Sequence, residues 1–384
     1  MQIKNLDKVA KRIKKAIKNK EKIILYGDAD PDGISSLIIL KESIKNLGGR
    51  ISAIYFPNRE IEGYGLNENA LKLLERKKPA LLFLLDCGIG NFKEIEKAKK
   101  MGFEVIVIDH HEILGKLPKA SIIVDPKQEG DNYPFKNLAT AGIVYKLAQL
   151  LLGDKFGQAL KESFLELVAI ATLADMMPKE SENKIFIDKG LLSLERTFRP
   201  GLRAFLEKEE IEKKRDIYQK VSKIISALNS GKAKDHLNES YLLLTTADFQ
   251  EAKELAETLL QRSFERKQKI EEIQEVLRKR IEKKSDPLII FEGESSWPIT
   301  LIGPVASKIC QEYQKPTFIY QKGKKESVGA VRMPQLLNAV KAMESCSQYL
   351  KTFGGHPLAG GFTVSNENLE KFQECLIKYF KSNL

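Results

Sequence analysis

Three aspartates, Asp28, Asp30 and Asp32, stand at alternate positions directly after a short apolar run. Alternate residues of an extended backbone point to the same side, so the three carboxylates would lie together. Carboxylates this close repel one another strongly unless cations lie among them. The spacing therefore predicts a metal site. An EF-hand calcium loop opens on the same pattern, but its twelfth position requires glutamate and Ile39 stands there, which argues against that kind of site.

Further hard ligands follow two other apolar runs. Asp86 follows one, and Asp109, His110 and His111 follow the other. The chain has only 4 histidines, so two side by side at the end of an apolar run favour a functional position. Carboxylates with imidazoles and without thiolates favour manganese or magnesium over zinc. Enough ligands are present for two ions bridged by a carboxylate, an arrangement that predicts phosphoester hydrolysis.

Short apolar runs separated by helical patterns are expected to position these ligands. The runs cover residues 23–26, 51–56, 81–85, 105–108 and 122–124. This alternation predicts βαβ units and a mainly parallel sheet. In open sheets of this kind the ligand crevice lies beyond the carboxyl ends of the strands. Because the acidic and histidine motifs fall at those ends, we expect them to meet in one crevice.

The rest of the chain predicts a helical part and a second α/β domain. Residues 140–245 are chiefly helical in pattern, and residues 248–284 have the apolar spacing of one helix about 55 Å long. After Ser285-Asp286-Pro287 we expect strands at 288–291, 317–320, 327–331 and 362–364. The predicted class is α/β, with a parallel-sheet domain at 1–200, a helical connector with a long linking helix at 201–285, and a smaller α/β domain at 286–384.

Composition limits the possible partners and surroundings. The formal charge of +11 must lie mostly outside a carboxylate-rich site, which suits a polyanionic partner or a generally lysine-rich surface. The longest apolar run, residues 80–85, is too short for a membrane span, and no signal peptide pattern opens the chain. We expect a cytoplasmic protein without membrane contact. The 4 cysteines lack CxxC spacing, so we expect them to be reduced and mostly buried.

Four motifs, in order, resemble the signatures of the DHH phosphoesterases: 28–33, 84–88, 109–111 and 171–178. Segments 57–65, 297–307 and 354–362 are similar to the RecJ branch and its associated domain, so the resemblance covers nearly the whole chain. It implies a DHH domain followed by a DHH-associated domain, with two ions, Mn²⁺ or Mg²⁺, as cofactors. The implied metal ligands are Asp28, Asp30, Asp32, Asp86, His110 and Asp175, with one aspartate bridging. Without the resemblance, Asp175 would be interpreted as a carboxylate at a helix end.

The resemblance also implies roles in catalysis and substrate binding. Asp109 would orient His110, and His111 would contact the scissile phosphate or protonate the leaving oxygen. The implied substrate contacts are Arg59, Tyr64, Asn229, Arg332, Gly355 and His356. The arginine that usually neighbours Asn229 is not found, and the chain stops soon after the glycine-rich motif. Without the oligonucleotide-binding barrel of longer relatives, grip on long strands is expected to be weaker.

The functional expectation is a manganese-dependent exonuclease that acts on an end of single-stranded DNA or RNA. Replication or repair proteins are possible partners. One alternative is a phosphodiesterase of short oligonucleotides or cyclic dinucleotides, which would lose activity on longer strands. Another is a non-catalytic subunit of a replication complex. The full set of metal ligands argues against this last alternative.

Overall fold

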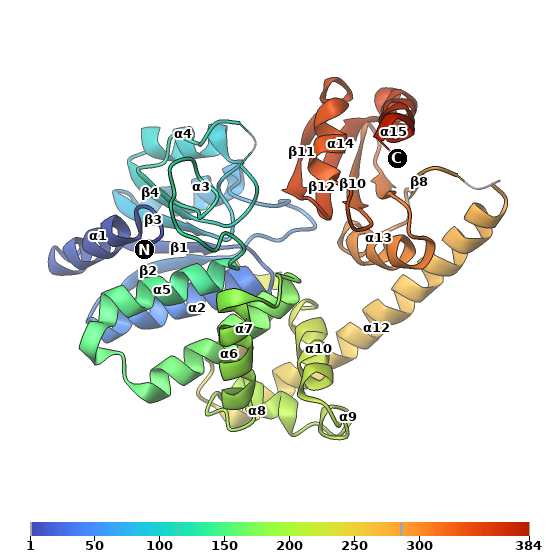
Figure 1. Ribbon diagram of the computed structural model, residues 1–384. Helices are drawn as coiled ribbons and strands as arrows, with labels where there is room; N and C mark the ends of the chain where they lie inside the picture. Colours follow the sequence, from blue (N-terminus) through green and yellow to red (C-terminus); the bar gives the residue numbers. More distant parts are fainter. Residues whose placement is uncertain (1, 114, 285–286, 384) are drawn as a thin grey trace. The chain divides into compact units, whose positions relative to one another are not determined.

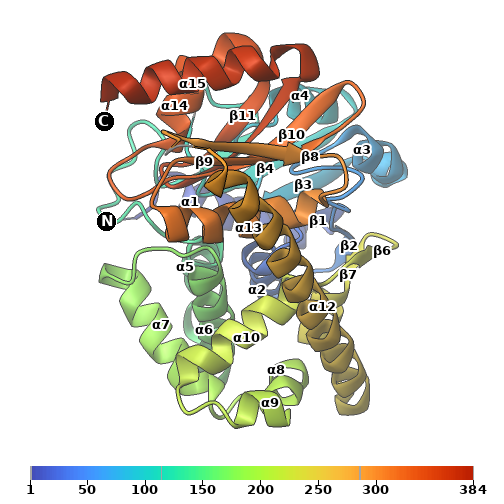
Figure 2. The same ribbon diagram turned by 90° about the vertical axis from the view of Figure 1, so that its right-hand side faces the viewer.

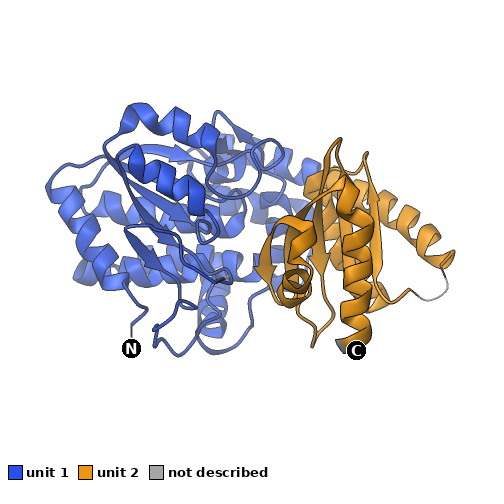
Figure 3. Ribbon diagram, turned by 90° about the horizontal axis from the view of Figure 1, so that it is seen from above, with its two compact units in different colours: residues 1–263 blue, residues 264–384 orange. Residues whose placement is uncertain are grey.

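The computed structural model describes residues 2–113, 115–284 and 287–383. It divides into two compact units, residues 1–263 and 264–384 (Figure 3). Helix α12, Phe249–Glu282, runs through the division and is 34 residues long, close to the long helix predicted from the sequence. The predicted connector ends at Ser285 and the last domain begins at Asp286, and both lie outside the described residues. The three-part division of the chain remains a prediction.

The first unit is built on a parallel sheet in the order β2-β1-β3-β4-β5 (Figure 1). Every neighbouring pair in it is parallel, as the sequence predicted. The central strands are buried along their whole length, because helices cover both faces and leave no side for polar residues. The strands are β1 Ile23–Gly27, β2 Ile51–Tyr55, β3 Ala80–Leu85, β4 Phe103–Ile108 and β5 Ile122–Val124.

Helices cover the two faces of this sheet in two separate groups. Leu25, Phe83 and Ile106 point to the face that packs against α1, α2 and α5. The alternate residues Leu84 and Val107 point to the face under α3 and α4. The helices are α1 Leu6–Lys18, α2 Pro31–Asn46, α3 Glu68–Leu74, α4 Phe92–Lys100 and α5 Thr140–Leu152. Because all neighbouring strands are parallel, every connection between them leaves the same end of the sheet, where the acidic motifs stand.

A helical group completes the first unit and shares its main core. Apolar residues three or four apart, such as Val221, Ile224 and Leu228 of α10, form its buried faces. The first part of α12 packs there through Ala252, Ala256 and other apolar residues. The elements are α6 Gln158–Ala174, α7 Ser181–Leu194, α8 Pro200–Leu206, α9 Glu209–Glu212, α10 Ile217–Leu228, β6 Ala233–Lys234, β7 Leu237–Asn238 and α11 Glu239–Thr245.

The second unit is a mixed sheet in the order β11-β12-β10-β9-β8, with helices on both faces. The second part of α12 and α13 cover one face through Ile273, Leu277 and Ile302 (Figure 2). Helices α14 and α15 cover the other through Met343 and Phe372. The elements are β8 Ile290–Glu294, α13 Ile299–Tyr313, β9 Thr317–Lys322, β10 Glu326–Arg332, α14 Ala339–Ser345, β11 Leu350–His356, β12 Ala359–Ser365 and α15 Leu369–Asn383.

Two sequence predictions about the second unit were wrong. Strand β11 was not predicted, because its second half is glycine-rich and glycine weakens a strand pattern. The four cysteines were expected to be reduced, but Cys346 and Cys375 form a disulfide between the end of α14 and α15. Their separation of 29 residues carries no sequence signal. Among the described residues, no helix is long and apolar enough to cross a membrane.

Candidate metal centre

The segment after β1 turns directly into a helix. Asp30 is the N-cap of α2, its side chain accepts hydrogen bonds from the amides of Asp32 and Gly33, and Pro31 occupies the first helical turn. At Gly33 a Cβ would lie 2.4 Å from the carbonyl oxygen of Asp28, so only glycine fits this turn. The prediction of an extended backbone was therefore wrong beyond residue 30, and Asp32 joins a different group of ligands from Asp28 and Asp30.

The predicted ligands gather into two groups that share Asp86. One group is Asp28, Asp30 and Asp86, and the other is Asp32, Asp86, His110 and Asp175. Within each group one ligand atom of every residue lies within 4.8 Å of the others. The Nε2 of His110 lies 3.2 Å from Asp175 Oδ2 and 3.4 Å from Asp86 Oδ1. The structure thus brings all six predicted ligands together, and Asp86 has the position of a bridging carboxylate.

The first turn of α5 braces two of these carboxylates. The hydroxyl of Thr140 donates to Asp86 Oδ1 at 2.9 Å, and the amides of Thr140 and Ala141 donate to the two oxygens of Asp32 at 2.7 Å each. Asp86 has φ of 61°, a left-handed conformation that is costly for a residue with a side chain. Sequence reasoning missed Thr140, because a threonine in an apolar helix carries no signal of its own.

Burial and mutual repulsion act on the carboxylates of the centre. Burial and the charge of Asp175 raise the pKa of Asp32 to about 7. Burial and the charges of Asp32 and Asp30 raise the pKa of Asp86 well above its ordinary value. Divalent cations would relieve both effects, and oxygen donors with one imidazole and no thiolate suit Mn²⁺ or Mg²⁺. The donor set therefore fits a centre of two such ions.

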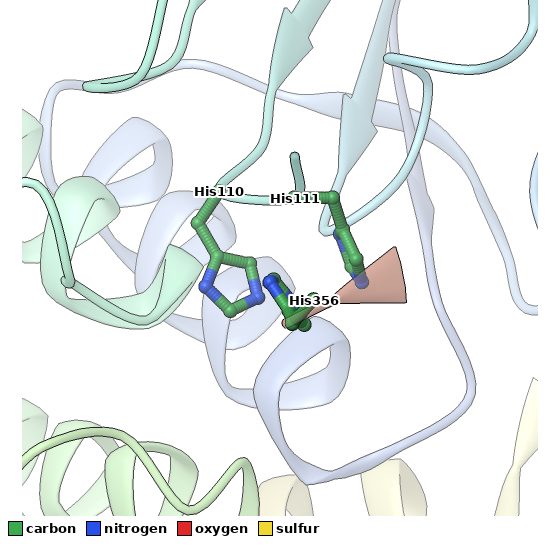
Figure 4. A group of neighbouring side chains, drawn as sticks. All are labelled: His110, His111 and His356. Atoms are coloured by element: carbon green, nitrogen blue, oxygen red, sulfur yellow. The ribbon is translucent and has the colours of Figure 1, made fainter. Parts of the chain in front are cut away.

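Histidine 110 is fully buried among the acids of the second group. Burial alone would lower its pKa, but the hydrogen bond to Asp175 and the charges of Asp175, Asp32 and Asp109 raise it to about 9. A cation at this position would replace the ring proton, because imidazole binds metals in its neutral form. Figure 4 shows the side chains of His110 and His111, which both come from the segment after β4.

Asp109 holds a different histidine from the one that the sequence indicated. Its Oδ1 lies 2.7 Å from Nδ1 of His111 and also accepts the amide of His110, while Oδ2 accepts the amide of Ile89. Burial opposes ionisation, but the charge and hydrogen bond of His111 hold the pKa of Asp109 below its usual range. The prediction that Asp109 orients the ring of His110 is corrected: the carboxylate orients His111, because both belong to one tight turn.

The loop after β2 brings Arg59 and Tyr64 to the centre. The Nε of Arg59 donates to Asp28 Oδ1 at 2.9 Å and its Nη2 donates to Asp30 Oδ2 at 2.9 Å. The hydroxyl of Tyr64 donates to the carbonyl oxygen of Asp86 at 3.0 Å and lies 3.2 Å from Nδ1 of His111. Both predicted substrate contacts therefore border the candidate metal site.

The remaining predicted contacts lie on other elements. Asn229 directly follows α10, outside both groups of ligands. In the second unit, Arg332 ends β10 and His356 ends β11, and both are level with Ala359 of β12 in the sheet register. Gly355 has φ of 135°, and a Cβ there would lie 2.3 Å from the carbonyl oxygen of Ala359, so this position requires glycine. The structure gathers Arg332, Gly355 and His356 at one end of the second sheet.

Comparisons with known proteins agree with this geometry. Residues 22–172 match the DHH family, N-terminal domain, and residues 286–382 match the DHHA1 domain. The chain is 32% identical over 379 residues to the single-stranded-DNA-specific exonuclease RecJ of Bacillus subtilis, covering 98% of this chain and 48% of that protein. It is 30% identical over 383 residues to the protein of the same name from Thermus thermophilus, covering 98% of this chain and 54% of that protein.

A solved structure extends the likeness to the fold. The crystal structure of an exonuclease RecJ bound to manganese superposes with a TM-score of 0.77 at 26% identity, covering 99% of this chain and 95% of the other. The chain spans about half the length of the two curated relatives described above. With both domain models matched in order and the ligand groups assembled at the end of the parallel sheet, the chain contains a DHH domain followed by a DHHA1 domain.

Proposed function

We propose that this chain is a metal-dependent nuclease that hydrolyses phosphodiester bonds at an end of single-stranded DNA or RNA. The observation that carries the proposal is the pair of buried ligand groups joined through Asp86. Two ions a few ångströms apart suit in-line displacement at phosphorus, because they neutralise the attacking and leaving oxygens together.

The residues that would hold the ions follow from the two groups. Asp28 and Asp30 would bind one ion, and Asp32, His110 and Asp175 the other, with Asp86 between them. When bound, Mn²⁺ or Mg²⁺ supplies Lewis acidity, which activates a water and neutralises charge on phosphoryl oxygens. The amides and hydroxyl of the first turn of α5 hold two of the carboxylates in place for this task.

Residues around the ligands would handle the phosphate and the proton. The ionised carboxylate of Asp109 keeps a proton on Nδ1 of His111, so Nε2 is the ring atom we assign to the scissile phosphate or the leaving oxygen. Arg59 offers a planar fork suited to phosphate oxygens, and Tyr64 offers a ring on which a base can stack. Both come from the loop beside the ligands.

The named relatives support the choice of substrate. The Bacillus subtilis and Thermus thermophilus proteins are named as single-stranded-DNA-specific exonucleases, and the superposed crystal structure is described as bound to manganese. The basic balance of this chain, +11, suits a polyanionic substrate. We therefore infer single-stranded DNA as the first substrate to test, with RNA beside it.

The experiment is a digestion of 5′-labelled and 3′-labelled single strands, DNA and RNA, over a range of lengths with Mn²⁺. We expect stepwise shortening from one end, and the label that disappears first gives the polarity. Asp86→Asn should abolish the reaction while circular dichroism shows an intact fold. Asp188→Asn is the matched control, because this exposed aspartate on α7 has Lys184 as its one ion-pair partner among the described residues.

Two results would contradict the proposal. Cleavage restricted to the shortest oligonucleotides would identify a phosphodiesterase that clears short products. Full activity of Asp86→Asn would show that the shared carboxylate is not part of the reaction.

A further inference from the structure

The guanidinium of Arg332, at the end of β10, is held by two neutral groups. Its Nε donates to the hydroxyl oxygen of Ser307 at 2.8 Å, and Nη1 donates to the carbonyl oxygen of Val331 at 2.8 Å. Ser307 belongs to α13, which packs against β10 and β9 on one face of the second sheet. These two contacts hold Nε and Nη1 and so fix the plane of the guanidinium, while Nη2 forms no hydrogen bond with the described residues.

No carboxylate of the described residues pairs with Arg332. Its hydrogen bonds are those to Ser307 and Val331, and burial lowers its pKa. A partly buried guanidinium without a counter-charge is costly, because the lost hydration of the ion is not replaced. The position is therefore suited to an anion brought by a ligand.

The helix beside Arg332 leaves room at Nη2. Gly303 lies one turn before Ser307 on α13, and a Cβ at Gly303 would lie 3.4 Å from Nη2 of Arg332. The missing side chain thus keeps the space beside Nη2 open, while the serine one turn later holds the guanidinium through Nε.

We propose that Ser307 is a positioning residue for substrate binding, which fixes the plane of Arg332 so that its Nη2 group, kept accessible by Gly303, receives a phosphate group of the strand. The inference rests on the proposed function and adds to it a specific contact in the second unit. Ser307 would not touch the substrate itself. Its effect would be on binding, because an arginine free to rotate no longer directs its Nη2 group at the phosphate oxygens.

The test measures binding and turnover separately. Fluorescence anisotropy with a labelled oligothymidylate in EDTA reports binding without cleavage, and steady-state rates in Mn²⁺ give KM and kcat. We expect Ser307→Ala to weaken binding and raise KM about tenfold, as for loss of one hydrogen bond to a charged group, with kcat within about twofold. Ser307→Thr, which keeps the hydroxyl, should restore both values.

Ser327→Ala is the matched control. Ser327 lies on β10, the same strand as Arg332, and its buried hydroxyl donates to Asn366. The substitution removes this hydroxyl and leaves the contacts of Arg332 in place. Equal losses in Ser307→Ala and Ser327→Ala would overturn the proposal and indicate general damage to the sheet. Unchanged binding by Ser307→Ala would overturn it as well.

Gly303→Ala keeps the test decisive if Ser307→Ala folds poorly. Alanine favours a helix over glycine, so this variant should be at least as resistant to heat as the parent. We nevertheless expect weaker binding of the oligothymidylate, because the new methyl group narrows the space at Nη2. If this helix had a purely structural role, the variant would keep its heat resistance and would bind the oligothymidylate as well as the parent or better.

Failure of this inference can be told apart from failure of the proposed function. Inorganic pyrophosphate, titrated by calorimetry, probes the Arg332 position without any cleavage. If the parent chain binds pyrophosphate and Ser307→Ala binds it about tenfold more weakly, the inference holds even if no strand is digested. If the parent digests strands but binds no pyrophosphate, the inference fails and the nuclease assignment stands.

Discussion

The two units bury an excess of charge of opposite sign. In the first unit, burial and neighbouring acids raise the pKa of Asp32 and Asp86, so the neutral form is favoured. In the second unit, burial lowers the pKa of Arg332, which has no carboxylate partner among the described residues. Each region therefore needs a counter-charge from outside the chain: cations in the first and an anion in the second. Under the proposed function, a phosphodiester substrate and divalent metal ions would supply these counter-charges.

The largest expected effect is a difference between the two units in the kinetic parameter that a substitution changes. Asp86→Asn should lower kcat by more than about 100-fold, beyond the cost of losing a residue that only orients a ligand, because both ligand groups lose their shared member. Arg332→Gln should instead raise KM with little change in kcat, because it removes a binding contact. Steady-state kinetics on one oligothymidylate measures both. A lower kcat without a higher KM in Arg332→Gln would contradict this division between a catalytic first unit and a substrate-binding second unit.

Thr140→Val tests whether the brace on Asp86 matters for metal affinity. The variant keeps the shape of the side chain and removes the hydroxyl that donates to Asp86 Oδ1. We expect Mn²⁺ to bind about 10- to 100-fold more weakly by calorimetry, the usual cost of losing a group that orients a ligand. Thr140→Ser should bind like the parent. Thr172→Val removes another buried hydroxyl, which donates to a backbone carbonyl and not to a carboxylate, and should leave Mn²⁺ affinity unchanged. An equal loss of Mn²⁺ affinity in Thr172→Val would show that the loss in Thr140→Val is not specific to Asp86.

Arg59 should compete with a cation for two carboxylates. Its guanidinium pairs with Asp28 and Asp30, which belong to one ligand group. Arg59→Gln should therefore tighten Mn²⁺ binding roughly tenfold, comparable to one charge-assisted hydrogen bond, while it raises KM for the strand. Arg12→Gln, which also breaks pairs with two acids, Glu21 and Glu104, should leave Mn²⁺ affinity as it was. Weaker Mn²⁺ binding by Arg59→Gln would contradict competition.

The smallest effect concerns a buried acid outside the two groups. Asp125 follows β5, its Oδ2 has no hydrogen-bond partner among the described residues, and burial with the charge of Asp109 raises its pKa from 3.8 to about 7. Between those values the unfolded chain has released the proton and the folded chain retains it. Its contribution to folding stability is therefore greatest at low pH and falls as pH rises toward 7.

Asp125→Asn removes this pH dependence. In urea unfolding with EDTA, the free energy of unfolding of the variant should rise relative to that of the parent by about 1–2 kcal/mol between pH 4 and pH 8. This is less than the full pKa shift of Asp125 implies, because the amide of asparagine needs hydrogen-bond partners of its own. Asp131→Asn breaks an ion pair with Lys136 and should lose stability instead. A difference between parent and Asp125→Asn that stays constant with pH would mean that Asp125 is ionised in the folded chain.

Much of the fold could be predicted from local patterns in the sequence. The five strands of the first sheet, their parallel direction and the long helix follow from apolar runs and helical spacing, which depend on neighbouring residues alone. Strand β11 did not follow, because its glycines give a weak pattern and pairing with β12 supplies the order. The Cys346–Cys375 disulfide was missed for a related reason, since it depends on how α14 meets α15.

The sequence by itself determined the ligand types and placed them at strand ends, where a parallel sheet must bring them together. Only the tertiary structure decided how they divide. It separated Asp32 from Asp28 and Asp30 by starting α2 at Pro31, gave Asp86 to both groups, and assigned Asp109 to His111. It also supplied Thr140 and Ser307, whose hydroxyls hold charged groups that lie 54 and 25 residues away. Contacts of this kind depend on packing between elements, and neighbouring residues in the sequence do not encode them.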